Sequence, residues 1–599
     1  MSFAMFPFRH PPGSAPDSQR QFKLLVRHFF ERHFDNELVS RNSDANLGLA
    51  HILAVLAVPG LFIPLFLYPK YMDLTSRPPI YNRFPKGMDW SLPPAALQEL
   101  AAAADRLFFV SLAMAVLGLV TVLKWETLFP DRRDFSVLGV LPLRHGTIFK
   151  AKLVSLLLFL GVFAATLNSF PALTFSIFTL VGRKVGFSYA ALSVFGHAVG
   201  VFAASAFIFF FFVALEGVLI NTLSYRAFLR LSPYIQVLSI VALLSALFLS
   251  PRMGGLLDTF RKGHSPIANW LPPYWFVGLC ELVRGNPDPI LRAWGFRALE
   301  ALSCAVGVAL VTYAISYTRH VRRMIEAGDN LAVERTRPSA FLTRFLDRWL
   351  LRHPLEQASF YFVAQTVTRS NRQRLFLAGY VGVGFALVFQ GLVTTFASFK
   401  RLDPAADALL SIPLILSFFT LSGMRFIFSI PSDLPANWVF QMTENTNRKA
   451  CLAGVRKAML ALVVVPLFAS LLPFYILLWD VQRALLQTVF GVTLSLILVE
   501  VLLLNFHKIP FTCTFLPGKA NITLFGFLYF LAFTTYAYTM AALESWLLVS
   551  PLGMAVFVAV AAPILWRLIA FRNQLLNEGT GFIFEDKAEP AVQTLDLSS

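Results

Sequence analysis

The sequence predicts an all-α integral membrane protein with about twelve transmembrane helices in two repeated six-helix halves, together with amphipathic interfacial helices. Composition is the first reason: of 599 residues, 56% are hydrophobic and 14% charged, and the mean hydropathy is +0.64, well above that of soluble globular proteins. The second reason is the number of apolar stretches of about 20 residues, the length that crosses a hydrocarbon core of about 30 Å. The third is a Glu–Asn motif that recurs in the fourth and in the tenth of these stretches.

The formal net charge of +17 raises the question of nucleic-acid binding. The basic residues gather beside the apolar stretches and no nucleic-acid-binding motif accompanies them, so we expect no nucleic-acid partner. The tendency of Lys and Arg to concentrate in cytoplasmic loops explains the charge more simply. The four cysteines stand apart in the sequence without a C-x-x-C pair, so we expect neither a disulfide framework nor a zinc site.

The beginning of the chain predicts a helix on the membrane surface. It has no early apolar core of a signal peptide, so we expect a cytoplasmic N-terminus. From Gln19 to Val39, Phe22, Leu25 and Phe29 recur on one side of a helix and basic groups on the other, which is typical of a helix lying in the interface. Two further amphipathic pieces of this kind are predicted, from Phe341 to Leu351 and from Phe360 to Val367.

Apolar stretches of spanning length occur in both halves of the chain. In the first half we predict spans at His51–Tyr68, Leu107–Leu123, Leu153–Leu180, Leu192–Ile220, Ile235–Leu249 and Ala298–Tyr317. In the second half we predict them at Leu375–Phe396, Ala408–Phe428, Ala458–Leu478, Leu485–Leu504, Ile522–Leu543 and Leu552–Ile569. The arginine-rich segment from Arg319 to Arg374 is cytoplasmic if both termini are, so we predict a multi-pass protein of the plasma (inner) membrane with both termini cytoplasmic.

A basic segment from Phe129 to Lys152 separates the second predicted span from the third. Its acidic residues favour the start of a short helix and Pro142 favours its end, which predicts an amphipathic helix on the inner membrane face. The pattern D-R-R-D, followed by Leu138 and by Leu141-Pro142, resembles the coupling segment of ABC-2 type permeases, the membrane subunits of ATP-binding cassette transporters. The alternative interpretation is a basic cytoplasmic loop of any polytopic membrane protein.

The resemblance implies a function that depends on a partner. In the family this segment docks onto a separate ATPase, which implies that an ABC ATPase subunit, in two copies, is contacted by Arg132, Arg133, Asp134 and Leu141. The chain itself has no P-loop, because the nearest stretch, Gly518-Lys519, is followed by Ala520 where Ser or Thr is required. We therefore expect a membrane transport subunit that is not an enzyme, with no cofactor or metal on this chain and with ATP and magnesium on the partner. Export is the commoner use of the family, and lipids, drugs and polysaccharides all remain open as substrates.

Two further segments extend the resemblance. ABC-2 permeases open with an amphipathic helix that helps to hold the ATPase, a role that Gln19–Val39 would fill; an ordinary membrane-surface helix is the alternative. They also carry short re-entrant helices before their sixth span, where Asn269–Gly285 has paired prolines and aromatic residues; a plain aromatic belt is the alternative.

The Glu–Asn motif indicates an internal repeat. Glu216 and Asn221 form E-G-V-L-I-N near the end of the fourth predicted span, and Glu500 and Asn505 form E-V-L-L-L-N near the end of the tenth. Such a match at corresponding places suggests duplication, and it makes these four residues candidates for intramembrane polar pairs. The repeat divides the chain into a first permease half with its interfacial helix, a basic cytoplasmic linker and a second permease half, at residues 1–320, 321–372 and 373–599.

The two glutamates also support a different class of function. A charge inside the membrane costs about 2.5–3.5 kcal/mol or more and is kept for a reason. Glu216 and Glu500 either pair structurally with Arg226 and Lys508, or act directly as the coupling groups of an ion-coupled secondary transporter that needs no nucleotide. A third hypothesis is a membrane-embedded enzyme or scaffold, for which the sequence offers no catalytic motif.

Overall fold

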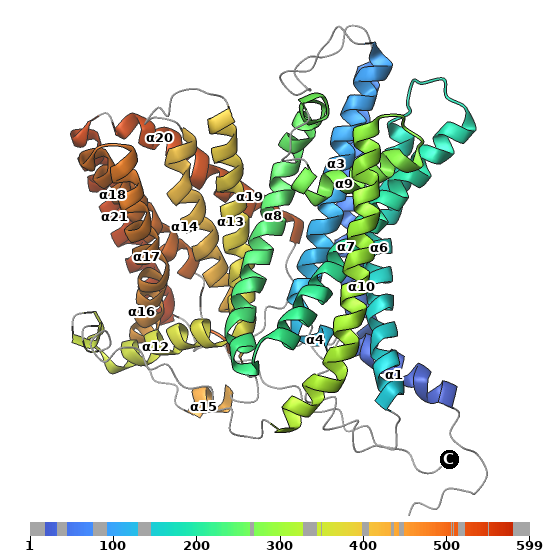
Figure 1. Cartoon of the computed structure of the whole chain (residues 1–599). Coiled ribbons are helices and arrows are strands. Elements are labelled where there is room, and N and C mark those ends of the chain that lie inside the picture. The colour runs from blue at the N-terminus through green and yellow to red at the C-terminus, as the bar shows by residue number, and fades with distance from the viewer. Residues whose placement is uncertain are drawn as a thin grey trace, which may run out of the picture. The chain divides into compact units, whose positions relative to one another are not determined.

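The structure is a computed structural model of the chain. It describes residues 18–32, 45–75, 93–129, 145–263, 269–326, 344, 346–348, 350–397, 407–432, 437–442, 448–504, 506, 508–512, 522–548 and 550–578. Within these ranges the regular elements are helices and no strand occurs (Figure 1). This composition of elements confirms the predicted all-α class.

The chain divides into two compact units. The first comprises Met1–Val39, Ser43–Tyr225 and Gly254–Leu331, and the second comprises Ser40–Asn42, Arg226–Met253 and Ala332–Ser599. Helices of the first unit are α1 (Ser18–Arg32), α2 (Ala45–Thr75), α3 (Pro94–Leu123), α4 (Trp125–Leu128), α6 (His145–Phe178), α7 (Phe187–Thr222), α9 (Pro272–Val283) and α10 (Pro289–Glu326). Helices of the second unit are α12 (Pro354–Arg369), α13 (Asn371–Ala397), α14 (Asp407–Ile427), α15 (Asn437–Met442), α16 (Arg448–Met459), α17 (Val465–Leu478), α18 (Val481–Leu503), α19 (Ile522–Thr534), α20 (Met540–Leu547) and α21 (Pro551–Glu578). Helix α8 (Tyr225–Gly263) contributes most of its length to the second unit.

Ten helices of the described chain are long and apolar enough to cross a membrane. Their bounds are Ala95–Leu123, Gly146–Phe178, Phe187–Thr222, Arg230–Pro251, Pro289–Ser316, Asn371–Val393, Leu409–Ile427, Arg448–Leu478, Val481–Leu503 and Pro551–Asn577. The two other predicted spans, His51–Tyr68 and Ile522–Leu543, fall within α2 and within the run of α19, a π-helical turn (Thr535–Thr539) and α20, which are not among the ten. The protein is thus a multi-span membrane protein, while the count of twelve in two six-helix halves stays a prediction.

In the first unit, α7 is the helix against which the others pack. It contacts α3, α6, α9 and α10, and α6 in turn contacts α1 and α2. Glycines bring α9 close to its neighbours: a Cβ added at Gly196 would lie 2.8 Å from the carbonyl oxygen of Cys280, and one at Gly278 would lie 2.6 Å from that of Leu291. The absence of side chains at these two positions lets the backbones of α7, α9 and α10 approach closely, as is common between membrane helices.

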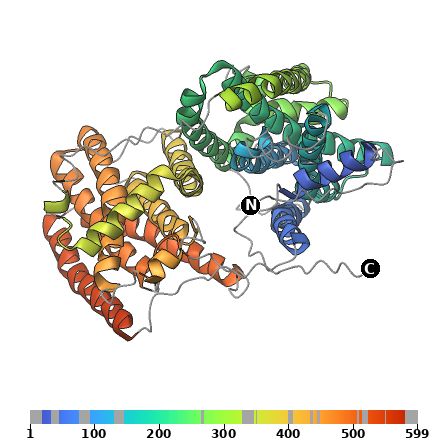
Figure 2. The same cartoon turned by 90° about the horizontal axis from the view of Figure 1, so that it is seen from below.

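In the second unit, α18 has the corresponding place. It contacts α14, α17 and α21, and α16 contacts α12. A π-helical turn (Leu460–Val464) joins α16 to α17, so that the two form one long helical run. Helix α12 lies crosswise to the long helices of its unit, as the views from the side and from below both show (Figures 1 and 2).

Candidate functional site

All four residues predicted to contact the ATPase lie outside the described residues, and so does one of the polar pair candidates: these are Arg132, Arg133, Asp134 and Leu141, and Asn505. The prediction of a coupling segment therefore remains open. Glu216, Asn221 and Glu500 are described, and the contacts around them define the buried polar sites of the two units.

Asn221 joins α7 to α10 in the first unit. Its side-chain nitrogen donates to the carbonyl oxygen of Thr312 at 3.2 Å and to the hydroxyl of Ser316 at 2.8 Å, both on α10. It also donates to the carbonyl oxygen of Gly217 in its own helix at 2.8 Å. Glu216, at the preceding turn, is buried. The E-G-V-L-I-N motif thus stands at a helix–helix contact held by interhelical hydrogen bonds.

Glu500 is the centre of a buried ion cluster in the second unit. One carboxylate oxygen accepts a hydrogen bond from Arg456 of α16 at 3.0 Å, and the other accepts one from Arg572 of α21. Glu500 and Arg572 are both buried, and Arg456 is partly exposed. The carboxylate of α18 therefore ties together three helices that are far apart in the sequence, in place of the suggested pairing with nearby Lys508.

The residue next to Arg456 reaches in the other direction, to the crosswise helix α12. Lys457 forms an ion pair with Glu356 of α12 and donates to the carbonyl oxygen of Leu350 at 2.8 Å. A Cβ added at Gly454 would lie 2.5 Å from the carbonyl oxygen of Glu356, so the two helices are in close backbone contact. Two adjacent cations of α16 thus connect α12 on one side with the Glu500 cluster on the other.

Helix α12 also holds the segment that precedes it. The hydroxyl of Tyr361 donates to Asp347 at 2.8 Å. Burial, and then the hydrogen bond and the negative charge of Asp347, raise the pKa of Tyr361 to about 12, so this phenol stays a donor throughout the physiological pH range. The predicted amphipathic piece Phe360–Val367 lies within α12, with Phe360 and Val363 buried against the unit.

The first unit has a similar arrangement at α1, the helix predicted at the start of the chain. Leu25 and Phe29 of α1 form a buried apolar cluster with Ile148 and Ala151 of α6. The buried ammonium of Lys152 lies 5.6 Å from the centroid of the Phe29 ring and donates to the carbonyl oxygen of Phe129 at 2.9 Å. Here too, an amphipathic helix rests on the first turns of a long helix beside a buried basic residue.

A second buried ion cluster, in the first unit, surrounds Glu281 of α9. Its carboxylate binds Arg106 of α3, and Arg284 approaches its two oxygens at 2.7 and 2.9 Å. Asn286 donates to the same carboxylate at 2.9 Å. Charged donors bind both oxygens of this carboxylate, so they compensate for the hydration that it loses on burial.

The Glu281 cluster continues along a chain of charged hydrogen bonds. Arg284 donates to the hydroxyl of Tyr189 at 2.6 Å, and that hydroxyl donates to Glu99 at 2.7 Å. Arg183 reaches the same oxygen of Glu99 at 3.1 Å. The network ties α3, α7 and α9 together at one end of the unit.

Several of these groups were missed by sequence reasoning. The second span was predicted to begin at Leu107, which left Arg106 in a loop, whereas α3 begins at Pro94 and carries Arg106 inside the helix. The partners of Glu500 are separated from it by 44 and 72 positions, so no local pattern could reveal them. Within the described residues, no group of three or more His, Cys, Asp or Glu side chains could hold a metal ion.

No protein-family model, curated protein or solved structure matches this chain. The clusters described above are therefore interpreted from their own geometry.

Proposed function

We propose that this chain is the permease subunit of an ATP-binding cassette transporter of the ABC-2 type, and that it exports a substrate with energy from two copies of a separate ATPase chain. The observation that carries the proposal is the pair Arg456 and Lys457, which links the amphipathic helix α12 to the buried Glu500 cluster through adjacent residues of α16. An amphipathic helix in this position offers a surface on which a cytoplasmic protein can act.

The link supports a mechanical role because close contacts and ion pairs join each of its parts to the next. The backbone contact at Gly454 and the ion pair between Lys457 and Glu356 prevent α12 from sliding over α16. The cluster of Glu500 with Arg456 and Arg572 joins α16 to α18 and α21. A displacement of α12 by a docked ATPase would therefore move several spanning helices together, as in shear or rigid-body transitions of packed helices.

The same cluster disfavours the ion-coupled alternative for Glu500. A carboxylate paired with two arginines is stabilised in its ionised form, and it must break both pairs in order to take up a proton or a metal cation. Its two partners therefore favour a structural role for Glu500 over that of a coupling group.

The first test is capture of the tagged chain from its native membranes in mild detergent, with mass spectrometry of bound proteins and an assay of ATP hydrolysis. We expect a stoichiometric partner with a P-loop, whose hydrolysis is inhibited by vanadate. The absence of any such partner, with the chain intact and monodisperse, would overturn the proposal.

The second test separates the α12 link from the docking of the ATPase. Lys457→Glu should place two acidic side chains together, leave the ATPase bound and weaken the effect of this chain on ATP hydrolysis. The double variant Lys457→Glu with Glu356→Lys should recover most of that effect, because the pair is restored in reverse. Arg483→Glu, at the exposed start of α18, is the matched charge control. If Lys457→Glu, the double variant and Arg483→Glu all had the same effect on ATP hydrolysis, the link between α12 and α16 would not transmit the motion.

The predicted coupling segment is tested in the same assay. Charge reversal at Arg132 and Arg133 should uncouple ATP hydrolysis from transport and leave folding intact. Wild-type coupling in that variant would contradict the assignment of this segment.

A further inference from the structure

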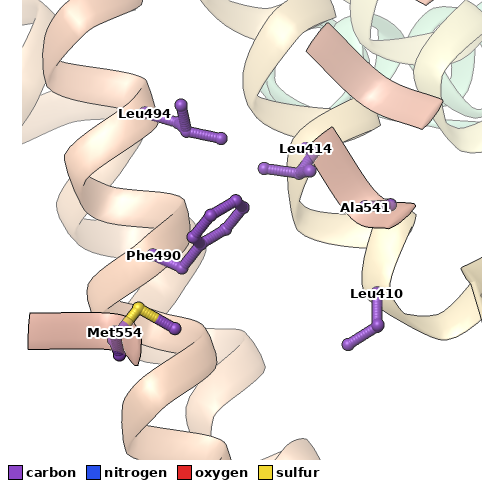
Figure 3. Close-up of a cluster of buried hydrophobic side chains, with 6 residues drawn as sticks. All are labelled: Leu410, Leu414, Phe490, Leu494, Ala541 and Met554. Atoms are coloured by element: carbon purple, nitrogen blue, oxygen red, sulfur yellow. The ribbon is translucent and has the colours of Figure 1, made fainter. Parts of the chain in front are cut away.

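One buried acidic residue of the second unit takes no part in the clusters described above. Glu544 lies on the short helix α20 and has no exposed surface. Ala541, one turn earlier on the same helix, belongs to a buried apolar cluster with residues of three other helices (Figure 3). These are Leu410 and Leu414 of α14, Phe490 and Leu494 of α18, and Met554 of α21. Glu544 is therefore placed beside the apolar core of this unit.

The carboxyl group of Glu544 has no hydrogen-bond partner in the described part of the chain that would compensate for its burial. Neither of its oxygens has a hydrogen-bond partner there. The side chain of Gln487 on α18 is also buried, and it interacts with the hydroxyl of Tyr475 on α17. Gln487 lies one turn before Phe490, so it flanks the same apolar cluster from the opposite helix.

The ionisable groups on the surrounding elements do not neutralise Glu544. Among the described residues, two phenols interact with it electrostatically: Tyr475 of α17 and Tyr536 of the adjacent π-helical turn. Tyr475 donates to the carbonyl oxygen of Leu409 at 2.9 Å, and Tyr536 shares a hydrogen bond with Ser417 at 3.1 Å, so both hydroxyls are engaged elsewhere.

The cations of the packed helices belong to other contacts. On α14, Arg425 donates to the carbonyl oxygen of Leu502, and on α21, Arg572 binds Glu500 while Arg567 is exposed. At the start of α18, Arg483 forms an exposed pair with Asp480. None of these guanidinium groups is a described partner of Glu544.

An ionised carboxylate in such a place would be very unfavourable. An unpaired buried charge costs several kcal/mol even after relaxation, and the group escapes this cost by becoming neutral. A protonated carboxyl group avoids the cost of the unpaired charge, and it is both a hydrogen-bond donor and a hydrogen-bond acceptor.

We propose that Glu544 is a proton-binding site of this protein: its carboxyl group holds a proton while α20 is packed as in this structure, and releases it when the site opens to water. The step is the dissociation of the carboxyl O–H bond, which leaves the electron pair on the carboxylate and transfers the proton to water. The proposal concerns the charge state of one residue and does not depend on the ATPase.

The charge state can be observed directly by infrared spectroscopy of the purified protein at neutral pH. We expect the carbonyl stretch of a protonated carboxylic acid in the wild type, and its loss in Glu544→Gln. Glu500→Gln is the matched control, because Glu500 is equally buried but paired with two arginines and should contribute no such band. A wild-type spectrum without the band, or a band that persists in Glu544→Gln, would overturn the proposal.

Folding of the variants is informative in itself. A neutral acid can be replaced by a neutral amide or by an apolar side chain, so Glu544→Gln and Glu544→Leu should both be produced as monodisperse protein. Failure of both to fold, beside a well-folded Ala542→Leu control on an exposed position of the same helix, would show that the fold requires the negative charge and would contradict the proposal.

Discussion

Glu281 and Glu544 occupy similar places in the two units and have opposite surroundings. Each lies on a short helix directly before the last long helix of its unit, α9 before α10 and α20 before α21. Their exposed fractions are 4% and 0%. Yet Glu281 binds two arginines and an asparagine, whereas Glu544 has no hydrogen-bond partner among the described residues.

The difference shows that burial alone does not determine the charge state of a membrane carboxyl group. Desolvation acts on both residues, and the partners decide the outcome. Around Glu281 the guanidinium groups compensate for desolvation, so the carboxylate fixes α9 to α3. Around Glu544 the described part of the chain offers no compensating partner, so the group is suited to exchange a proton. The comparison can be tested by measuring stability after changes at each site.

The largest effect is expected from removal of the paired carboxylate. Glu281→Ala leaves Arg106 buried without its counter-charge and should lower the free energy of unfolding by about 3–5 kcal/mol. Glu544→Ala removes a neutral group and should cost about 2 kcal/mol or less, as expected for a small cavity. Unfolding by denaturant in mixed micelles measures both. Equal losses at the two sites would remove the distinction between them.

A different pH dependence should accompany the different charge states. The folded chain keeps a proton on Glu544 that the unfolded chain loses above the ordinary glutamate pKa of about 4.3. The folded state then binds more protons, so wild-type stability should fall relative to Glu544→Gln as the pH rises above that value, by at most about 1.4 kcal/mol per pH unit. Melting temperatures of the two proteins between pH 5 and 8 test this, with Glu500→Gln as a control that should show no such trend. A constant difference between wild type and Glu544→Gln would contradict it.

The two arginines that bind Glu500 should contribute unequally to the free energy of unfolding, because their side chains differ in exposure. The side chain of Arg572 is 6% exposed and that of Arg456 is 27% exposed. Arg572→Met should therefore cost about 3 kcal/mol, since it leaves a deeply buried carboxylate with one partner. Arg456→Met should cost about 1 kcal/mol, because solvent already screens that pair. The same unfolding titration ranks the two variants, and a reversed order would be inconsistent with the burial argument.

The close packing of α9 depends on glycine residues, and adding a side chain at one of them should have a smaller effect on stability. A Cβ at Gly200 would overlap the sulfur of Cys280, so Gly200→Ala should cost about 1–3 kcal/mol. Adding Cys280→Ala should recover part of that loss by removing the sulfur. Gly161→Ala is the matched control on α6, since nothing lies within 4 Å of its added Cβ. If the double variant recovered none of the lost stability, the strain in Gly200→Ala would not come from the contact with the sulfur of Cys280.

Sequence reasoning found the class of the fold and missed most of the polar sites, for a physical reason. Hydropathy averages over a span, so it located ten helices that the structure bears out and the amphipathic helices α1 and α12. The same averaging ends a predicted span where charge appears, so Arg106 fell before the span at Leu107 and Glu544 fell just after the span ending at Leu543. Arg284 lies close to Glu281 in the sequence, but Arg106 and both arginines of Glu500 come from other helices and become visible as partners only when those helices are packed.

The smallest effect is expected where a partner is present and burial is absent. Arg27 and Glu31 on α1 form an ion pair at 2.7 Å, but their side chains are 76% and 57% exposed. Water and salt screen this pair, and two long side chains lose rotamer freedom in forming it. Arg27→Gln should therefore leave the unfolding midpoint within the error of the titration, at low and at high salt. If it shifted the midpoint as much as Arg572→Met, pairing alone would account for stability, and the contrast between Glu281 and Glu544 would need another cause than the joint action of burial and partners.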